Sequence, residues 1–262
     1  MAQLIKLQEY VSRYELDLTK YSNQFVRLKK QRWIEKKAEA GIGDSTNHAR
    51  LSAIKKAFLD ELFANQLRWA SSTAFEKSLL APRYETDPLL KLLLQKLPDT
   101  YLLMYEPVFQ IEQAPIELEA VLIAPLEIYC LAFLEGEKDD IYLASRERFW
   151  KVWRDDKQVK VMNPLLSLKR THAIVSRLVK KAFPIKQVLV ARHGYVDHFQ
   201  GWHVDCIDKR NVQQWLEKHA ANPTPMKFQQ MKAARALLNH TRTEYYERVE
   251  NSTISWEIEQ ND

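Results

Sequence analysis

Residues 116–178 constrain the fold more than any other part of the sequence, because they predict two adjacent strands, an aromatic and basic ribbon, and a capped helix in succession. Residues 116–125 include the apolar run Val121, Leu122 and Ile123, and residues 126–136 are rich in β-branched and aromatic side chains. Only the turn at Pro125 separates the two runs, so we expect them to form an antiparallel hairpin.

Local signals place further elements around this hairpin. Asn163 followed by Pro164 is typical of a helix N-terminus, and so is Asp87 followed by Pro88. The remaining expected elements are strands at residues 188–191 and 253–258 and helices over residues 89–97, 211–219 and 226–240.

The N-terminal region has the most regular apolar spacing in the chain. Steps of three and four residues predict an apolar seam on one or two consecutive helices, and another helix is expected over residues 48–69. The seam consists of Leu4, Leu7, Val11, Tyr14, Leu18, Tyr21, Phe25 and Leu28. Its aromatic members favour packing within the molecule, and the alternative is self-association as a coiled coil.

Composition excludes several classes of protein. With 262 residues and 46% hydrophobic content, the chain can bury a sizeable core. The first residues do not have the layout of a signal peptide and no run has 18 apolar residues, so we expect a cytoplasmic protein without a membrane partner. The two cysteines, Cys130 and Cys206, predict neither a disulfide framework nor a structural zinc site.

The order of elements over residues 85–219 resembles the NERD (nuclease-related) domain, a branch of the PD-(D/E)XK nuclease superfamily. The matching features are the acidic and apolar sequence at residues 117–123, Trp150 or Trp153, and Asn163-Pro164-Leu165. The resemblance implies an α/β fold with a restriction-endonuclease-like mixed sheet flanked by helices over residues 81–220. Residues 1–80 would then be a helical N-terminal extension, and residues 221–262 a C-terminal helix and strand.

The resemblance also identifies the positions at which the family carries its catalytic groups. Glu119 stands in place of the metal-binding aspartate, and Glu117 is a second candidate metal ligand. Ala132 and Leu134 occupy the positions of the E-x-K glutamate and lysine, and Ser167 replaces a glutamine. Metal-assisted hydrolysis needs a second carboxylate and a cationic group, which alanine and leucine cannot supply. The resemblance therefore implies a catalytically inactive scaffold that contacts DNA or a protein partner and needs no cofactor.

An active nuclease is the alternative. It would use Mg²⁺ or Mn²⁺ and recruit groups from the acidic turn at residues 135–140, such as Glu135, Glu137 and Lys138. The period of two along a strand opposes this, because Glu137 and Lys138 are adjacent and the interval from Glu135 to Lys138 is odd. We therefore expect a solvated turn there.

Charge is strongly segregated along the chain. Residues 99–141 hold 1 basic and 10 acidic residues, whereas residues 142–192 hold 13 basic and 3 acidic residues. The second block predicts a nucleic-acid-binding face formed by Arg146, Arg148, Lys151, Arg154, Lys169 and Arg170. The alternative is that these side chains are solvated or pair with the acidic hairpin, and that Phe149, Trp150 and Trp153 belong to the core. Several histidines at residues 193–203 do not have the spacing of a metal site.

Overall fold

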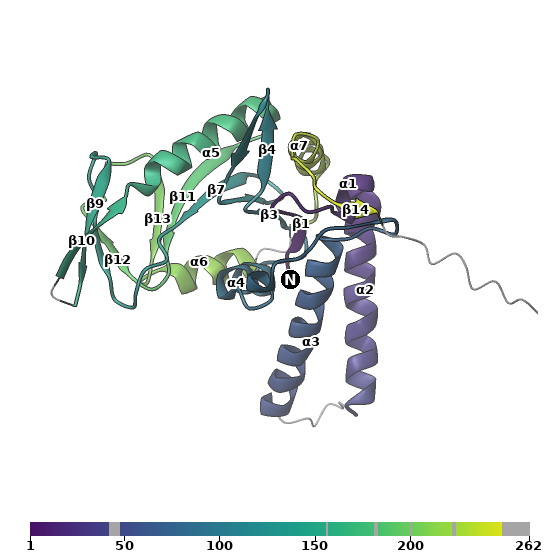
Figure 1. Ribbon diagram of the computed structural model, residues 1–262. Helices are drawn as coiled ribbons and strands as arrows, with labels where there is room; N and C mark the ends of the chain where they lie inside the picture. The colour runs from purple at the N-terminus through teal and green to yellow at the C-terminus, as the bar shows by residue number, and fades with distance from the viewer. Residues whose placement is uncertain (42–47, 156, 181–182, 200, 222–223, 248–262) are drawn as a thin grey trace, which may run out of the picture.

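The computed structural model describes residues 1–41, 48–155, 157–180, 183–199, 201–221 and 224–247. It is a mixed α/β structure built on a six-stranded sheet (Figure 1). In spatial order the strands are β1 (Gln3–Leu7), β3 (Leu102–Tyr105), β6 (Ala120–Ile123), β7 (Ile128–Phe133), β11 (Ile185–Ala191) and β13 (Asp205–Asp208). The pairs β3–β6 and β6–β7 are antiparallel, and β1–β3, β7–β11 and β11–β13 are parallel.

Helices cover both faces of this sheet, and the alternation of side chains along the strands divides the core into two layers. Val121 and Ile123 pack in the layer beneath α5 (Pro164–Val179) and α7 (Phe228–Leu238). Ala120 and Leu122 pack in the opposite layer with α3 (His48–Trp69), α4 (Pro88–Lys96) and α6 (Val212–Ala220). Burial on both faces explains why β6 and β7 read as nearly continuous apolar runs.

The expected hairpin is confirmed in β6 and β7, but the expectation of a single first strand from residue 116 is wrong. Residues 114–117 form a separate strand, β5 (Ala114–Glu117), which pairs with β4 (Val108–Ile111). The register is the same in the two pairs, since Leu102 faces Ile123 and Val108 faces Glu117. Between them Glu106 has a φ of 48° and Pro107 has no backbone N–H to donate, so the ladder is interrupted and one apolar run becomes two strands.

Helix starts follow the local signals closely. The Asn163 side chain accepts a hydrogen bond from the backbone N–H of Leu165 (3.0 Å) at the start of α5. Asp87 accepts from Leu89 (2.8 Å) and Leu90 (3.0 Å) at the start of α4. Helices α3, α6 and α7 also occur where they were expected, and the strand expected at residues 253–258 lies outside the described residues.

The N-terminal seam is only partly helical. Leu4 and Leu7 lie in β1, so the prediction that they belong to a helix is wrong. All five residues of β1 are buried, and in a strand covered on both faces a three-residue spacing does not distinguish strand from helix. Val11 lies between β1 and the first helix, outside any helix. The rest of the seam follows in α1 (Arg13–Leu16) and α2 (Leu18–Glu39), whose residues Leu18 and Phe25 are buried in the core of the same chain.

A second, four-stranded sheet lies at the end of the molecule remote from α2 and α3 (Figure 1). Its strands are β10 (Lys157–Met162), β9 (Phe149–Arg154), β8 (Ile141–Leu143) and β12 (Tyr195–Asp197). Smaller elements are the 3-10 helix η1 (Pro82–Tyr84) and the pair β2 (Glu76–Lys77) and β14 (Tyr246–Glu247). Among the described residues, no helix is both long and apolar enough to cross a membrane.

Candidate functional site

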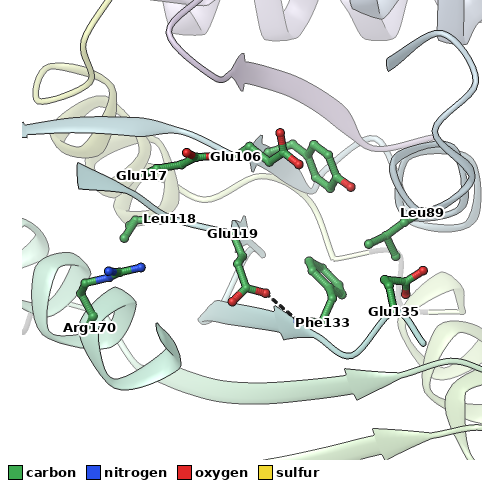
Figure 2. Close-up of a pocket in the computed structure, with 9 residues that line it drawn as sticks. Leu89, Glu106, Glu117, Leu118, Glu119, Phe133, Glu135 and Arg170 are labelled. Atoms are coloured by element: carbon green, nitrogen blue, oxygen red, sulfur yellow. Dashed lines mark hydrogen bonds between the residues drawn. The ribbon is translucent and has the colours of Figure 1, made fainter. Parts of the chain in front are cut away.

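A pocket of about 340 Å³ opens beside the ends of β6 and β7 (Figure 2). Four glutamates and one arginine give it a predominantly acidic lining, and α4 and α5 contribute one residue each. The lining residues are Leu89, Tyr105, Glu106, Glu117, Leu118, Glu119, Phe133, Glu135 and Arg170. The pocket therefore forms where the resemblance implies a nuclease site.

Glu119 is held by two hydrogen bonds at the centre of this pocket. One carboxylate oxygen accepts from the backbone N–H of Phe133 (2.7 Å), and the other accepts from the hydroxyl of Ser167 on α5. Burial raises the pKa of Glu119, and these two hydrogen bonds and the nearby Arg170 oppose that rise. Ser167, at the position where the resemblance implies a glutamine, thus occupies one of the two carboxylate oxygens of Glu119.

The two E-x-K positions belong to the apolar core. Ala132 has an exposed fraction of 0% and Leu134 of 7%, and both pack in the layer beneath α5. The register pairs Ala120 with Leu131, so the next pair along the ladder brings Glu119 opposite Ala132 on the same face. On the side of Glu119 that faces β7, there is therefore a methyl group where metal-assisted hydrolysis would require a second carboxylate.

Arginines bind two of the other carboxylates around the pocket. Glu135 accepts three hydrogen bonds from Arg192, the shortest at 2.6 Å. Glu106 binds Arg83 (2.6 Å) and also accepts from the Tyr84 hydroxyl. Glu117 is exposed on β5. Across the described part of the chain, His, Cys, Asp and Glu side chains form no group of three placed to hold a metal ion.

The structure brings together some residues of the rearranged site and separates others. Glu117, Glu119 and Glu135 line one pocket, whereas Glu137 pairs with Arg154 (3.1 Å) and Lys138 does not line it. The turn at residues 135–139 is exposed or partly exposed as expected, but Asp140 is buried. The sequence did not predict that Glu106 lines the pocket or that Arg192 binds Glu135. For Glu106, the sequence feature that could have indicated this is its position in the acidic block at residues 99–141.

The six basic residues expected to contact nucleic acid lie in two places. Arg146 and Arg148 are exposed before β9 and Lys151 is exposed on it, while Lys169 and Arg170 are exposed on α5. Arg154 differs, because both of its terminal nitrogens are engaged by Asp140 and Glu137. The expected pairing of the basic block with the acidic turn is thus confirmed for Arg154.

The aromatic residues of the ribbon are divided between the two faces of the second sheet. Trp150 is fully buried, as expected of a core residue. Phe149 and Trp153 are exposed by 43% and 44%, so the alternative that the rings belong to the core is confirmed for Trp150 and wrong for these two. The period of two along β9 places these two rings on the face opposite Trp150.

Comparison with known proteins gives one short match and no family. No family model matches the chain, and no solved structure matches it. A segment of 38 residues is 50% identical to RNA 2',3'-cyclic phosphodiesterase from Geobacillus stearothermophilus. The segment covers 14% of this chain and 12% of that protein, which is too little to assign a family.

Glu119→Gln is expected to raise the melting temperature at pH 7 by about 2–4 °C, the change that roughly 1 kcal/mol produces in a protein of this size. Because burial raises the folded-state pKa of Glu119 above 4.5, ionisation reduces stability as the pH rises through the raised pKa. The gain should therefore vanish in melts recorded below pH 4.5. Glu117→Gln, which changes an exposed carboxylate of the same pocket, is the control, and an equal gain in both variants would refute the explanation.

Proposed function

We propose that this chain is a NERD-like protein whose restriction-endonuclease-like core binds nucleic acid without hydrolysing it. The observation that carries the proposal is the burial of Ala132 and Leu134 in the apolar layer beneath α5. Hydrolysis of a phosphodiester requires charge stabilisation at those two positions, and neither side chain provides it.

The arrangement of elements supports the assignment to a nuclease-like core. Helix α4 precedes the acidic-apolar strand β6, which is followed by β7, the Trp-containing strand β9, helix α5 and strand β11. This is the order that the resemblance implies. The Asn163-Pro164 start of α5 brings Ser167 into contact with Glu119, so the N-P-L segment adjoins the acidic strand.

Free cationic side chains support nucleic acid as the bound partner. Arg146, Arg148, Lys151 and Lys169 are exposed, and none forms an ion pair with a described residue. Cations that are not used to stabilise the fold remain available to neutralise phosphates. The pocket itself has the opposite character, because its carboxylates would repel a phosphate backbone.

A working metal-dependent nuclease is the second candidate, and one observation favours it. Glu117, Glu119 and Glu135 line the same pocket, so they are the candidate oxygen ligands of a rearranged set, although among the described residues they are not placed to hold a metal ion together. Recruitment of Glu135 would require release of the carboxylate by Arg192, which now binds both of its oxygens.

Cleavage of supercoiled plasmid in Mg²⁺ and in Mn²⁺ separates the two candidates. We expect no cleavage by the native protein, together with retention of labelled nucleic acid in a binding assay at low salt. Glu119→Ala is the contamination control. Nicking that disappears in Glu119→Ala would contradict the proposal and support the rearranged nuclease, and absence of both cleavage and binding would exclude both candidates.

A further inference from the structure

The outer face of the four-stranded sheet is defined by the pairing of its strands. Trp153 on β9 has Gln158 of β10 on one side and Ile141 of β8 on the other, and Ile141 pairs with Tyr195 of β12. One step along the sheet, Lys151 lies between Lys160 and Leu143. At the next step Phe149 pairs with Met162. Cross-strand partners share a face, so this surface alternates rows of rings and apolar side chains with a row of lysines.

The rings on this face lie open to solvent. Phe149 and Trp153 are exposed by 43% and 44%, and Met162 by 60%, whereas Trp150 and Val152 on the opposite face are fully buried. Phe149 and Trp153 are four residues apart on one strand, so their Cα atoms are separated by about 13 Å, with Lys151 midway between them. The guanidinium of Arg148 lies 5.5 Å from the ring centre of Phe149. One cation, Lys151, therefore lies between the two rings, and a second, Arg148, adjoins the ring of Phe149.

Two lysines on this face repel each other. Lys151 and Lys160 are direct cross-strand partners, which places their Cβ atoms about 4.5–5.5 Å apart. Like charges in such a pair destabilise a sheet, and neither lysine forms an ion pair with a described carboxylate. Binding a polyanion across this row would remove the repulsion.

We infer that this outer face binds single-stranded nucleic acid, with bases stacked on Phe149 and Trp153 and the backbone phosphates on Lys151 and Lys160. The inference rests on the proposed function and specifies its surface and its ligand. A single strand is selected because its bases are free to stack on protein rings, whereas the bases of a duplex stack on one another. The nearby Arg146 and Arg148 extend the cationic track beyond the ring of Phe149.

A second copy of the chain fits this face poorly. Homodimer contacts bury the centre of their surface in an apolar environment, from which lysine is depleted. Here the central row contains Lys151 and Lys160, and its carboxylate, Asp197, lies two strands away from Lys151 and pairs with Arg210 (3.8 Å). A symmetric contact would therefore bring four ammonium groups together.

Fluorescence anisotropy of the full-length protein with labelled 20-nucleotide oligothymidine, oligouridine and a duplex of the same length tests the inference. Trp153→Ala should weaken single-strand binding at least about fivefold, because stacking on one ring contributes about 1–3 kcal/mol per base. Lys151→Gln should reduce the slope of log affinity against log salt by about 0.7, the value for one phosphate contact on a single strand. The native protein should prefer either single strand to the duplex.

Two variants on α7 serve as binding controls, and melting curves check that every variant is folded. Phe228→Ala removes a ring that is 80% exposed on α7, and Lys232→Gln removes an exposed charge from the same helix. Both should bind like the native protein. Equal affinity of the native, Trp153→Ala and Lys151→Gln proteins would overturn the inference and leave nucleic-acid binding elsewhere intact. Absence of any binding would overturn the proposed function as well, and a dimer that dissociates in Trp153→Ala would identify a protein interface instead.

Discussion

Glu15→Ala is expected to lower the free energy of unfolding by about 3–5 kcal/mol, because it leaves a buried ammonium group without its counter-ion. The side chain of Lys6 is fully buried in β1, and its Nζ lies 2.6 Å from Glu15 Oε1. The same nitrogen also donates to the carbonyl oxygen of Tyr10 (2.9 Å) and to the hydroxyl of Thr243 (2.7 Å). Removal of the carboxylate preserves those two hydrogen bonds but leaves the charge without its ion-pair partner, so that only the weaker attraction of Glu9 opposes the cost of burial.

The pH dependence of this variant follows from the titration of Lys6. Burial lowers the pKa of Lys6, and Glu15 raises it again in part. In Glu15→Ala the folded-state pKa falls further below the unfolded value of 10.5, so the unfolded chain binds more protons and stability rises with pH in that interval. Urea unfolding at pH 7 and pH 9.5 should therefore show a smaller deficit at the higher pH.

Glu9→Ala is the comparison for this effect, because Glu9 raises the pKa of Lys6 less than Glu15 does. Glu9 pairs with Arg242 at 3.5 Å, and both side chains are partly exposed, at 32% and 42%. Such a pair contributes at most about 1 kcal/mol. If Glu9→Ala and Glu15→Ala lose equal stability, the large effect does not come from desolvation of Lys6.

The helix starts were predictable because a cap depends on residues within three positions of one another. The side chains of Asn163 and Asp87 accept the hydrogen bonds that their position before proline predicts. Strand β1 was not predictable in this way, since its partner β3 lies about one hundred residues further along the chain. Its burial on both faces also removed the alternation that identifies a strand.

In the candidate site, too, residue types were predictable and contacts between distant segments were not. At Ala132 and Leu134, the positions that the resemblance matches to E-x-K, the absence of charged groups was apparent from residue types alone, and both side chains are buried. The contacts of Glu135 with Arg192 and of Glu106 with Arg83 join segments 57 and 23 residues apart, which no local spacing reveals. For the ribbon, alternation separates Trp150 from Phe149 and Trp153, but only the packing of Phe199 against Trp150 shows which face is covered.

Asp140→Ala should cost about 3 kcal/mol, because the carboxylate accepts charged and backbone hydrogen bonds in a nearly water-free position. The Asp140 side chain is 1% exposed and accepts from Arg154 Nε (2.9 Å) and from a terminal nitrogen of Arg154 (2.7 Å). It also accepts from the backbone N–H of Glu137 (3.0 Å). A Cβ built on Gly136 would lie 2.2 Å from one Asp140 oxygen, so the turn has no room for another side chain.

The contribution of Asp140 should disappear in acid. Its hydrogen bonds with Arg154 hold the pKa of Asp140 below the usual 3.8. A lowered folded-state pKa stabilises the protein at pH values above the unfolded-state pKa, and this stabilisation is lost as the pH falls through the folded-state pKa.

Glu137→Ala removes the exposed carboxylate that binds the same arginine, and it should cost less than about 1 kcal/mol. Urea unfolding at pH 7 should thus separate the two variants clearly, and unfolding well below pH 3.8 should bring Asp140→Ala close to the native protein. A deficit that is the same at both pH values would mean that cavity formation, and not the charge of Asp140, determines the stability of the turn between β7 and β8.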